Sequence, residues 1–169
     1  MSHSLYAASV PVFRQLLGSL AAVLETAEAH AQAGRIEPDA LLQARLFPDM
    51  FPLARQVQIA TDFAKGASAR LAGVEPPRFE DSEHTFAELQ QRISKTLGFI
   101  DGLQAQDVEA GASRAITHGS GERARHFDNG ARYLTHFALP QFCFHVTTAY
   151  AILRHNGVPI GKKDFVGAY

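Results

Sequence analysis

The sequence has little of the features that mark several specialised classes of protein. One residue in 169 is cysteine and none is tryptophan, so the chain has no basis for a disulfide framework. Its 16 Lys and Arg nearly cancel its 17 Asp and Glu, which leaves no basic footprint and predicts no nucleic-acid partner. The most apolar stretch, around residues 137–153, is interrupted by proline and polar residues. It falls short of the ~20 predominantly apolar residues that cross a bilayer, so we expect no membrane partner.

The first residues of the chain bear on where the protein is located. No basic residue precedes Arg14 and no unbroken apolar segment follows, so we expect no signal peptide. The lone Cys143 lies in an apolar run, where we expect a buried and unreactive thiol. A reduced, cytoplasmic location is therefore predicted.

What the chain does contain favours one helical domain over residues 1–169. Hydrophobic residues make up 46% of it, enough for a substantial core, and alanine and leucine, both helix formers, are its commonest residues. Apolar residues recur at steps of three and four along four segments. These segments are about Leu5–Ala33, with Pro11 as its kink or its start; a short helix Asp39–Leu46 followed, after a proline bend, by Leu53–Leu71; a segment opening at a Thr85/Glu88 capping box; and Pro140–Asn156.

The helical period disappears between Gly111 and Gly130. Two short runs, 113–118 and 122–127, flank Gly119-Ser120-Gly121, which indicates a hairpin or an irregular flap before the last helix. Asp128 or Asn129 is expected to cap the segment that follows. The sequence thus predicts an all-α four-helix bundle with one flap.

Polar residues interrupt two of the apolar helix faces and mark a candidate small-molecule pocket. His145 is surrounded in sequence by apolar residues of the last helix, and Gln56 and Asp62 interrupt the second. A carboxylate beside an imidazole is a common arrangement in catalysis and in metal binding. We therefore expect Gln56, Asp62, His145 and Tyr150 to line the pocket. The alternatives are that His145 forms a hydrogen bond in the core and that Asp62 pairs with a neighbouring cation such as Lys65.

This pair of residue types suggests a divalent metal as cofactor, with His145 and Asp62 as candidate ligands. Helical metal sites place ligands three or four residues apart, but no two of the eight histidines have that spacing. A third ligand would have to come from His118, His126 or His136.

Three segments of the chain resemble a known superfamily. LLQARLFPDMFPLARQVQIATDFAKGASARLAG, FEDSEHTFAELQQRISKTL and ALPQFCFHVTTAYAILRHNGVPIGKKDF look like an uncharacterised, domain-of-unknown-function branch of the DinB/YfiT-like superfamily. The resemblance implies a DinB-like four-helix bundle, often dimeric and frequently labelled a metalloenzyme. Its metal-binding members use one histidine from the second helix and two, spaced by four, from the last. Here Ala149 and Gln141 stand four residues from His145, and Asp62 or Phe63 stands at the second-helix position, so the pattern is not matched.

Three functions remain open from the sequence. The first is a cytoplasmic bundle with a small-molecule pocket near His145 and Asp62. The second is a divalent-metal-dependent transferase or hydrolase, and the third is a non-catalytic, dimeric interaction module in which the first helix closes the dimer. Whether the chain is an enzyme is left undecided, and a homodimer is the expected assembly.

Overall fold

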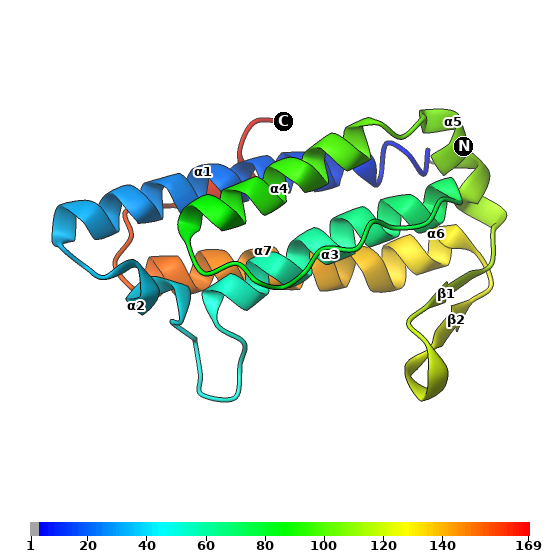
Figure 1. Cartoon of the computed structure of the whole chain (residues 1–169). Coiled ribbons are helices and arrows are strands. Elements are labelled where there is room, and N and C mark those ends of the chain that lie inside the picture. The colour runs from blue at the N-terminus through cyan, green and yellow to red at the C-terminus, as the bar shows by residue number, and fades with distance from the viewer. Residues whose placement is uncertain (1–3) are drawn as a thin grey trace.

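Four long helices form the body of the molecule, as predicted (Figure 1). The computed structural model describes residues 4–169. Three of the long helices are α1 (Val10–Gly34), α3 (Leu53–Ala72) and α4 (Phe86–Asp101); the fourth consists of α6 (Gly130–Tyr133), the π-helical turn η3 (Leu134–Ala138) and α7 (Leu139–His155). The short helices are α2 (Pro38–Leu42), α5 (Ala105–Ala110) and α8 (Lys162–Val166), with the 3₁₀ turns η1 (Gly111–Ser113) and η2 (Gly121–Arg123).

The apolar stripes of the four helices meet in one core. Phe13 of α1 and Phe142 of α7 pack edge to face there, with ring centroids 4.9 Å apart. The first helix begins at Val10, so Pro11 marks its start and does not kink it. The second begins at Leu53 as expected, whereas the short helix before it ends at Leu42 and leaves Leu46 exposed. None of the helices in residues 4–169 is long and apolar enough to cross a membrane.

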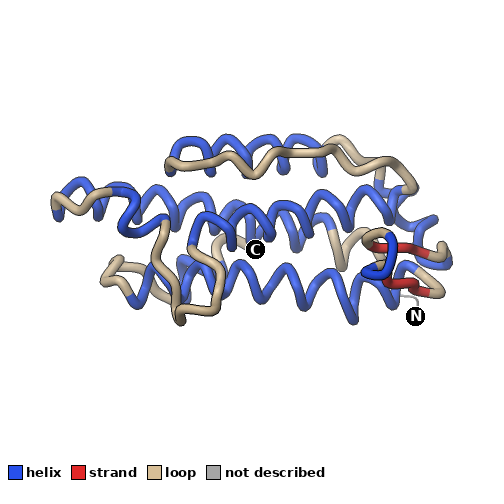
Figure 2. Tube along the Cα trace, turned by 60° about the horizontal axis from the view of Figure 1, so that its bottom comes forward, coloured by secondary structure: helices blue, strands red, loops and turns tan. Residues whose placement is uncertain are grey.

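The connection between α3 and α4 is long because these neighbouring helices run in the same direction (Figure 1). A 20-residue helix such as α3 is about 30 Å long at ~1.5 Å per residue. The chain must therefore travel back along the helix before α4 can begin. Residues 73–85, which we call the strap, do this without regular secondary structure (Figures 1 and 2).

The strap ends at the predicted capping box. Thr85 Oγ1 accepts a hydrogen bond from the Glu88 amide at 3.2 Å, and the Glu88 carboxylate accepts one from the Thr85 amide at 2.9 Å. These bonds satisfy amides that have no partner within the first turn of a helix. The start of α4 is thus determined locally.

The predicted flap is a two-stranded hairpin. Strands β1 (Ile116–His118) and β2 (Arg125–Phe127) pair antiparallel, with Thr117 opposite His126. Gly119 and Gly121 have φ angles of 81° and 56° in the turn, a conformation that favours glycine. The hairpin projects beside the end of α3 (Figure 1).

The last helix starts earlier than predicted. It begins at Gly130, where the Asn129 side chain accepts a hydrogen bond from the Arg132 amide, and not near Pro140. Proline has no N–H to donate, and in a regular α-helix its ring crowds the carbonyl one turn before it. The wider π-helical turn at Leu134–Ala138 lies where those carbonyls are, so the helix continues through Pro140.

Candidate functional site

A groove lies between α3, the strap and the hairpin. We call it the strap groove; it has a volume of about 820 Å³. Its lining combines rings, cations, carboxylates and the hairpin turn: Arg55, Ile59, Asp62, Phe63, Lys65, Gly66, Arg70, Glu75, Pro76, Pro77, Arg78, Phe79, His118, Gly119 and Ser120. Ligand pockets in proteins commonly have volumes of about 300–1,000 Å³ and combine apolar surface with a few polar groups.

Three rings from three elements form a stack at the base of the groove. Phe63 of α3 lies parallel to His118 of the hairpin at a centroid distance of 5.7 Å. Phe63 also stacks on His145 of α7, at a centroid distance of 6.0 Å. Phe63, which lines the groove, is therefore also in contact with His145, the histidine that the sequence analysis identified as a pocket candidate.

Both imidazoles of this stack are neutral at pH 7. Burial lowers the pKa of His118 to about 4, assisted by the positive charges of Arg70 and Arg125. Burial also lowers the pKa of His145 to about 4, assisted by Arg55. The Nδ1 atom of His118 lies 3.5 Å from the Tyr133 hydroxyl, so Nε2 is the ring nitrogen that can form a hydrogen bond at the groove wall.

Two of the four predicted pocket residues contact each other. His145 is buried, and its Nδ1 lies 2.7 Å from Gln56 Oε1 across the α3–α7 interface. With that carbonyl oxygen as acceptor, Nδ1 carries the proton. The Gln56 amide in turn donates to the Phe51 carbonyl at 3.0 Å, so its orientation is fixed.

The other two predicted residues lie elsewhere. Asp62 lines the strap groove but faces α4, where its Oδ1 binds Arg92 at 2.8 Å, and it also pairs with Lys65 at 2.8 Å. Tyr150 is on another face of α7, where its ring packs against Phe165 of α8 at 5.6 Å. The structure therefore does not gather the four side chains into one pocket.

Arg92 is the main polar residue that sequence reasoning missed. The helical pattern places it mostly outside the apolar face of α4, yet its side chain is only 1% exposed. Its Nε donates to Thr61 Oγ1 at 2.7 Å, and its guanidinium pairs with Asp81 and Glu83 of the strap at 3.0 Å each. Arg92 thus joins α4, α3 and the strap.

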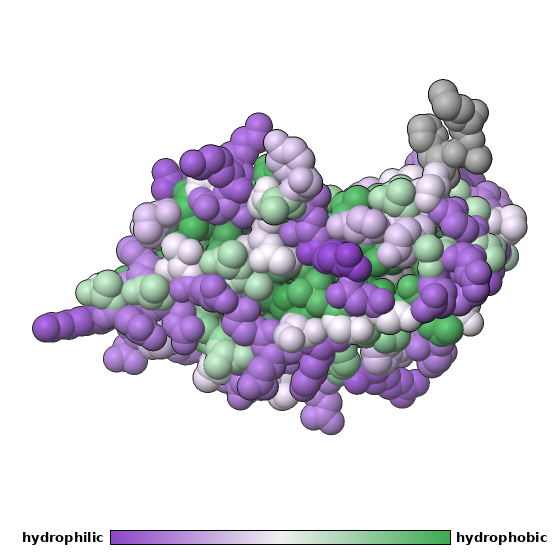
Figure 3. All heavy atoms as spheres, turned by 90° about the horizontal axis from the view of Figure 1, so that it is seen from above, coloured by the Kyte–Doolittle hydropathy of each residue, from purple (hydrophilic) through white to green (hydrophobic). Residues whose placement is uncertain are grey.

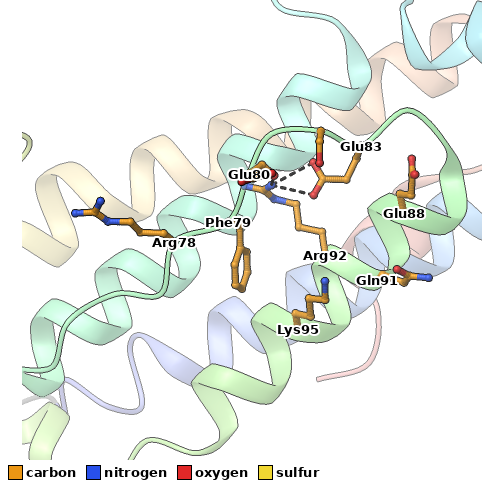
Figure 4. A pocket seen from close by; sticks show the side chains of 9 residues that line it. Arg78, Phe79, Glu80, Glu83, Glu88, Gln91, Arg92 and Lys95 are labelled. Carbon is orange, nitrogen blue, oxygen red and sulfur yellow. Dashed lines mark hydrogen bonds and ion pairs between the residues drawn. The ribbon is translucent and has the colours of Figure 1, made fainter.

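A second, smaller groove of about 340 Å³ lies on the other side of the strap (Figure 4). Figure 4 shows Arg92 reaching across it to Glu83, while Arg78, Phe79 and Lys95 lie around it. Since Arg92 and Glu83, its central polar groups, already bind each other, we interpret this groove as part of the contact between the strap and α4.

Charged and polar pairs hold the rest of the strap. Arg55 of α3 forms an ion pair with Asp81, and the Gln58 amide donates to Glu83 at 2.9 Å. The Lys65 ammonium lies 4.9 Å from the centre of the Phe79 ring, a cation–π contact. The three acidic residues Glu80, Asp81 and Glu83, together with Arg92 in the second turn of the following helix, were the signal in the sequence for this arrangement.

The described residues do not form a site for the metal that the superfamily implies. No three His, Cys, Asp or Glu side chains in residues 4–169 lie close enough together to hold an ion. His145 Nδ1 is directed to Gln56, and the Asp62 oxygen is directed to two cations. Of the proposed third ligands, His118 stacks on Phe63, while His126 and His136 contact Thr117 and Thr135.

We expect the His145 ring to titrate far below neutral pH in the folded protein. Between about pH 6.5 and 4, the unfolded chain binds this proton and the folded protein does not. The free energy of unfolding should therefore fall as the pH decreases through this window, and the His145 contribution should level off below about pH 4. NMR titration of its Hε1 signal, assigned with a His145→Gln variant, should give a midpoint near 4, and near 6.5 in urea. A midpoint near 6.5 in the folded protein would contradict the burial argument.

Relatives of the chain agree with this fold. Residues 5–166 match the family model described as Domain of unknown function (DUF1993). A solved structure described as a DinB family member protein from Shewanella denitrificans is similar over 98% of this chain and 93% of its own, at 42% identity and a TM-score of 0.90. No curated protein matches the chain.

Proposed function

The chain belongs to the DUF1993 family and has a DinB-like fold, and we propose that it is a small-molecule-binding protein whose ligand occupies the strap groove. The observation that carries the proposal is the convergence of apolar rings and polar groups from α3, the strap and the hairpin on one space of about 820 Å³. Asp62 belongs to its lining, and His145 supports it from behind through Phe63. The proposed site therefore differs from the pocket expected from the sequence, since Asp62 is the one residue of that set of four that lines the groove.

The rigid elements beside the groove favour a ligand site. Phe63 and Asp62 are on the middle of a long helix, whose packing against α7 and α4 holds them in place. Sites placed on helices keep their geometry better than sites made only of loops. The strap and the hairpin then supply walls that can adapt to a ligand.

A library of fragments, followed by ¹H–¹⁵N NMR, tests the proposal. We expect binders to shift the amide signals of α3 residues near Phe63 together with those of the hairpin turn. Ser120→Trp places an indole at the groove, so it should weaken these fragments about tenfold. Glu122→Trp is the matched control, because Glu122 is exposed on the same turn but does not line the groove.

Two results would overturn the proposal. One is a folded protein in which no fragment shifts the groove amides. The other is equal affinity of the two tryptophan variants for fragments that do shift them.

A homodimer and a cytoplasmic location stay predictions. The apolar residues of α1, such as Phe13 and Leu17, lie inside the core of the bundle itself.

Figure 3 looks down on the face that carries α1 and α4, where apolar side chains gather in the middle and polar ones surround them. Exposed apolar residues also occur at Leu46, Phe47, Phe51 and Phe144. These surfaces support a non-catalytic interaction module as the second candidate function.

A further inference from the structure

We propose that the ligand of the strap groove is a small organic molecule with an anionic group on a flat, unsaturated framework. This inference rests on the proposed function. Two sets of side chains in the lining lead to this class. One set is an excess of guanidinium groups without carboxylate partners, and the other is a series of rings.

The charges of the lining do not cancel within the protein. Asp62 is already bound by Lys65 and Arg92, and Arg55 is paired with Asp81. Two further guanidinium groups line the groove, those of Arg70 and Arg78, and neither has a carboxylate within ion-pair distance in residues 4–169.

Only one carboxylate of the lining remains to balance these two groups. It belongs to Glu75, which likewise forms no ion pair within the described part of the chain. Arg125 adds a positive charge near His118. A guanidinium group binds a carboxylate or phosphate through a planar pair of N–H donors, so the excess charge favours an oxyanion.

Arg70 is held in place for such a role. Its Nη1 donates to the Gly66 carbonyl at 2.9 Å, one turn earlier on α3, and the Tyr133 hydroxyl is a second partner of this guanidinium, whose five N–H groups exceed these two contacts. The nearby His118 ring is neutral at pH 7 and adds a hydrogen-bonding group without competing charge. An anion at this end of the groove would meet one fixed guanidinium, and Arg78 would approach from the strap.

The rings define the remainder of the ligand. Phe63 and His118 lie parallel, with an interplanar angle of 2°, and Phe79 lines the groove from the strap. These rings already contact neighbouring side chains but are partly exposed, and flat groups pack on the exposed part of such rings through dispersion and quadrupole interactions. A planar anion would therefore satisfy both parts of the lining, whereas a small inorganic ion would leave the rings exposed.

Three probes of one shape and different charge test the inference. Benzoate is an anion, benzamide is neutral and benzamidine is a cation, while their planar frameworks are nearly the same. We expect benzoate to shift the groove amides with an affinity about tenfold above that of benzamide, and benzamidine to bind more weakly still. The advantage of benzoate should shrink as salt is raised, because exposed charges are screened.

Two arginine variants test whether Arg78 is the group that binds the anion. Arg78→Gln should reduce the affinity for benzoate about tenfold and leave that for benzamide unchanged. Arg78 is exposed on the strap, so this variant keeps the core intact. Arg123→Gln is the matched control, since Arg123 is exposed on the hairpin but does not line the groove.

The outcomes separate this inference from the proposed function. Equal binding of benzoate and benzamide, or preference for benzamidine, would overturn the anion and leave the groove as a ligand site. Absence of groove shifts with all three probes would also overturn the anion, and the fragment library then decides about the groove independently. An Arg78→Gln variant that binds benzoate as well as the Arg123→Gln control would show that the strap guanidinium does not recognise the anion.

Discussion

Replacing Arg92 with methionine is expected to destabilise the fold by about 3–5 kcal/mol, a large part of the ~5–15 kcal/mol that stabilises a typical domain. Methionine keeps most of the side-chain volume but removes the guanidinium. Glu83 then loses its ion-pair partner, while Asp62 and Asp81 keep only Lys65 and Arg55. Removing one partner of a buried ion pair costs more than the pair contributes, because the remaining charges stay partly desolvated.

Urea unfolding followed by circular dichroism measures this loss. Lys95→Met is the matched control; Lys95 is exposed about one turn further along α4, so its replacement should change the free energy of unfolding by less than about 0.5 kcal/mol. Adding Asp62→Asn to Arg92→Met should restore part of the stability. A single Arg92→Met variant as stable as the control would show that the network does not hold the strap.

Gly111→Ala is expected to cost about 3 kcal/mol or more, although it adds only a methyl group. The backbone at Gly111 packs so closely on α3 that a Cβ would overlap the Leu71 carbonyl oxygen. Gly130, in turn, packs on the Gly111 carbonyl, so Gly130→Ala should have a similar effect. Overpacking in a core typically costs about 1–3 kcal/mol, and here the neighbouring atoms are backbone, which cannot rotate away.

Thermal and urea unfolding of a control substitution distinguishes this overlap from a general effect of alanine. Gly98 lies on an exposed part of α4, and a Cβ there would meet nothing within 4 Å. Gly98→Ala should therefore stabilise the protein by about 0.5–1 kcal/mol, because alanine favours the helix. Equal stability of the Gly111 and Gly98 variants would contradict the close packing at the root of the hairpin.

The helices and the hairpin could be predicted because their signals are local. The Thr85/Glu88 capping box determines where α4 begins, and Gly119 and Gly121 provide the turn conformation of the hairpin. Pro140 misled the prediction because proline is common in the first turn of a helix. Only the geometry of the preceding turn shows that the helix has already begun at Gly130.

The site could be predicted only in part, because its contacts are long-range. His145 and Gln56 interrupt apolar faces, and the sequence therefore identified both before their contact was known. Asp62 was expected beside the last helix, but the strap brings α4 next to α3 and supplies Arg92 as its partner. Nothing local to Arg92 shows that the strap covers it. Likewise, the stacking of His118 on Phe63 depends on how the hairpin folds against α3.

The attachment of the strap has a consequence for how the molecule fluctuates. The four helices are joined by apolar packing, whereas the strap is joined mainly by ion pairs and hydrogen bonds. Segments with few apolar contacts open at lower free energy than the core, as separate cooperative units. Amide protons of the strap should therefore exchange with solvent sooner than those of α3 and α4, and faster at high salt. One wall of the groove thus belongs to a less stable unit than its floor, so opening of the strap would expose the groove while the bundle stays folded.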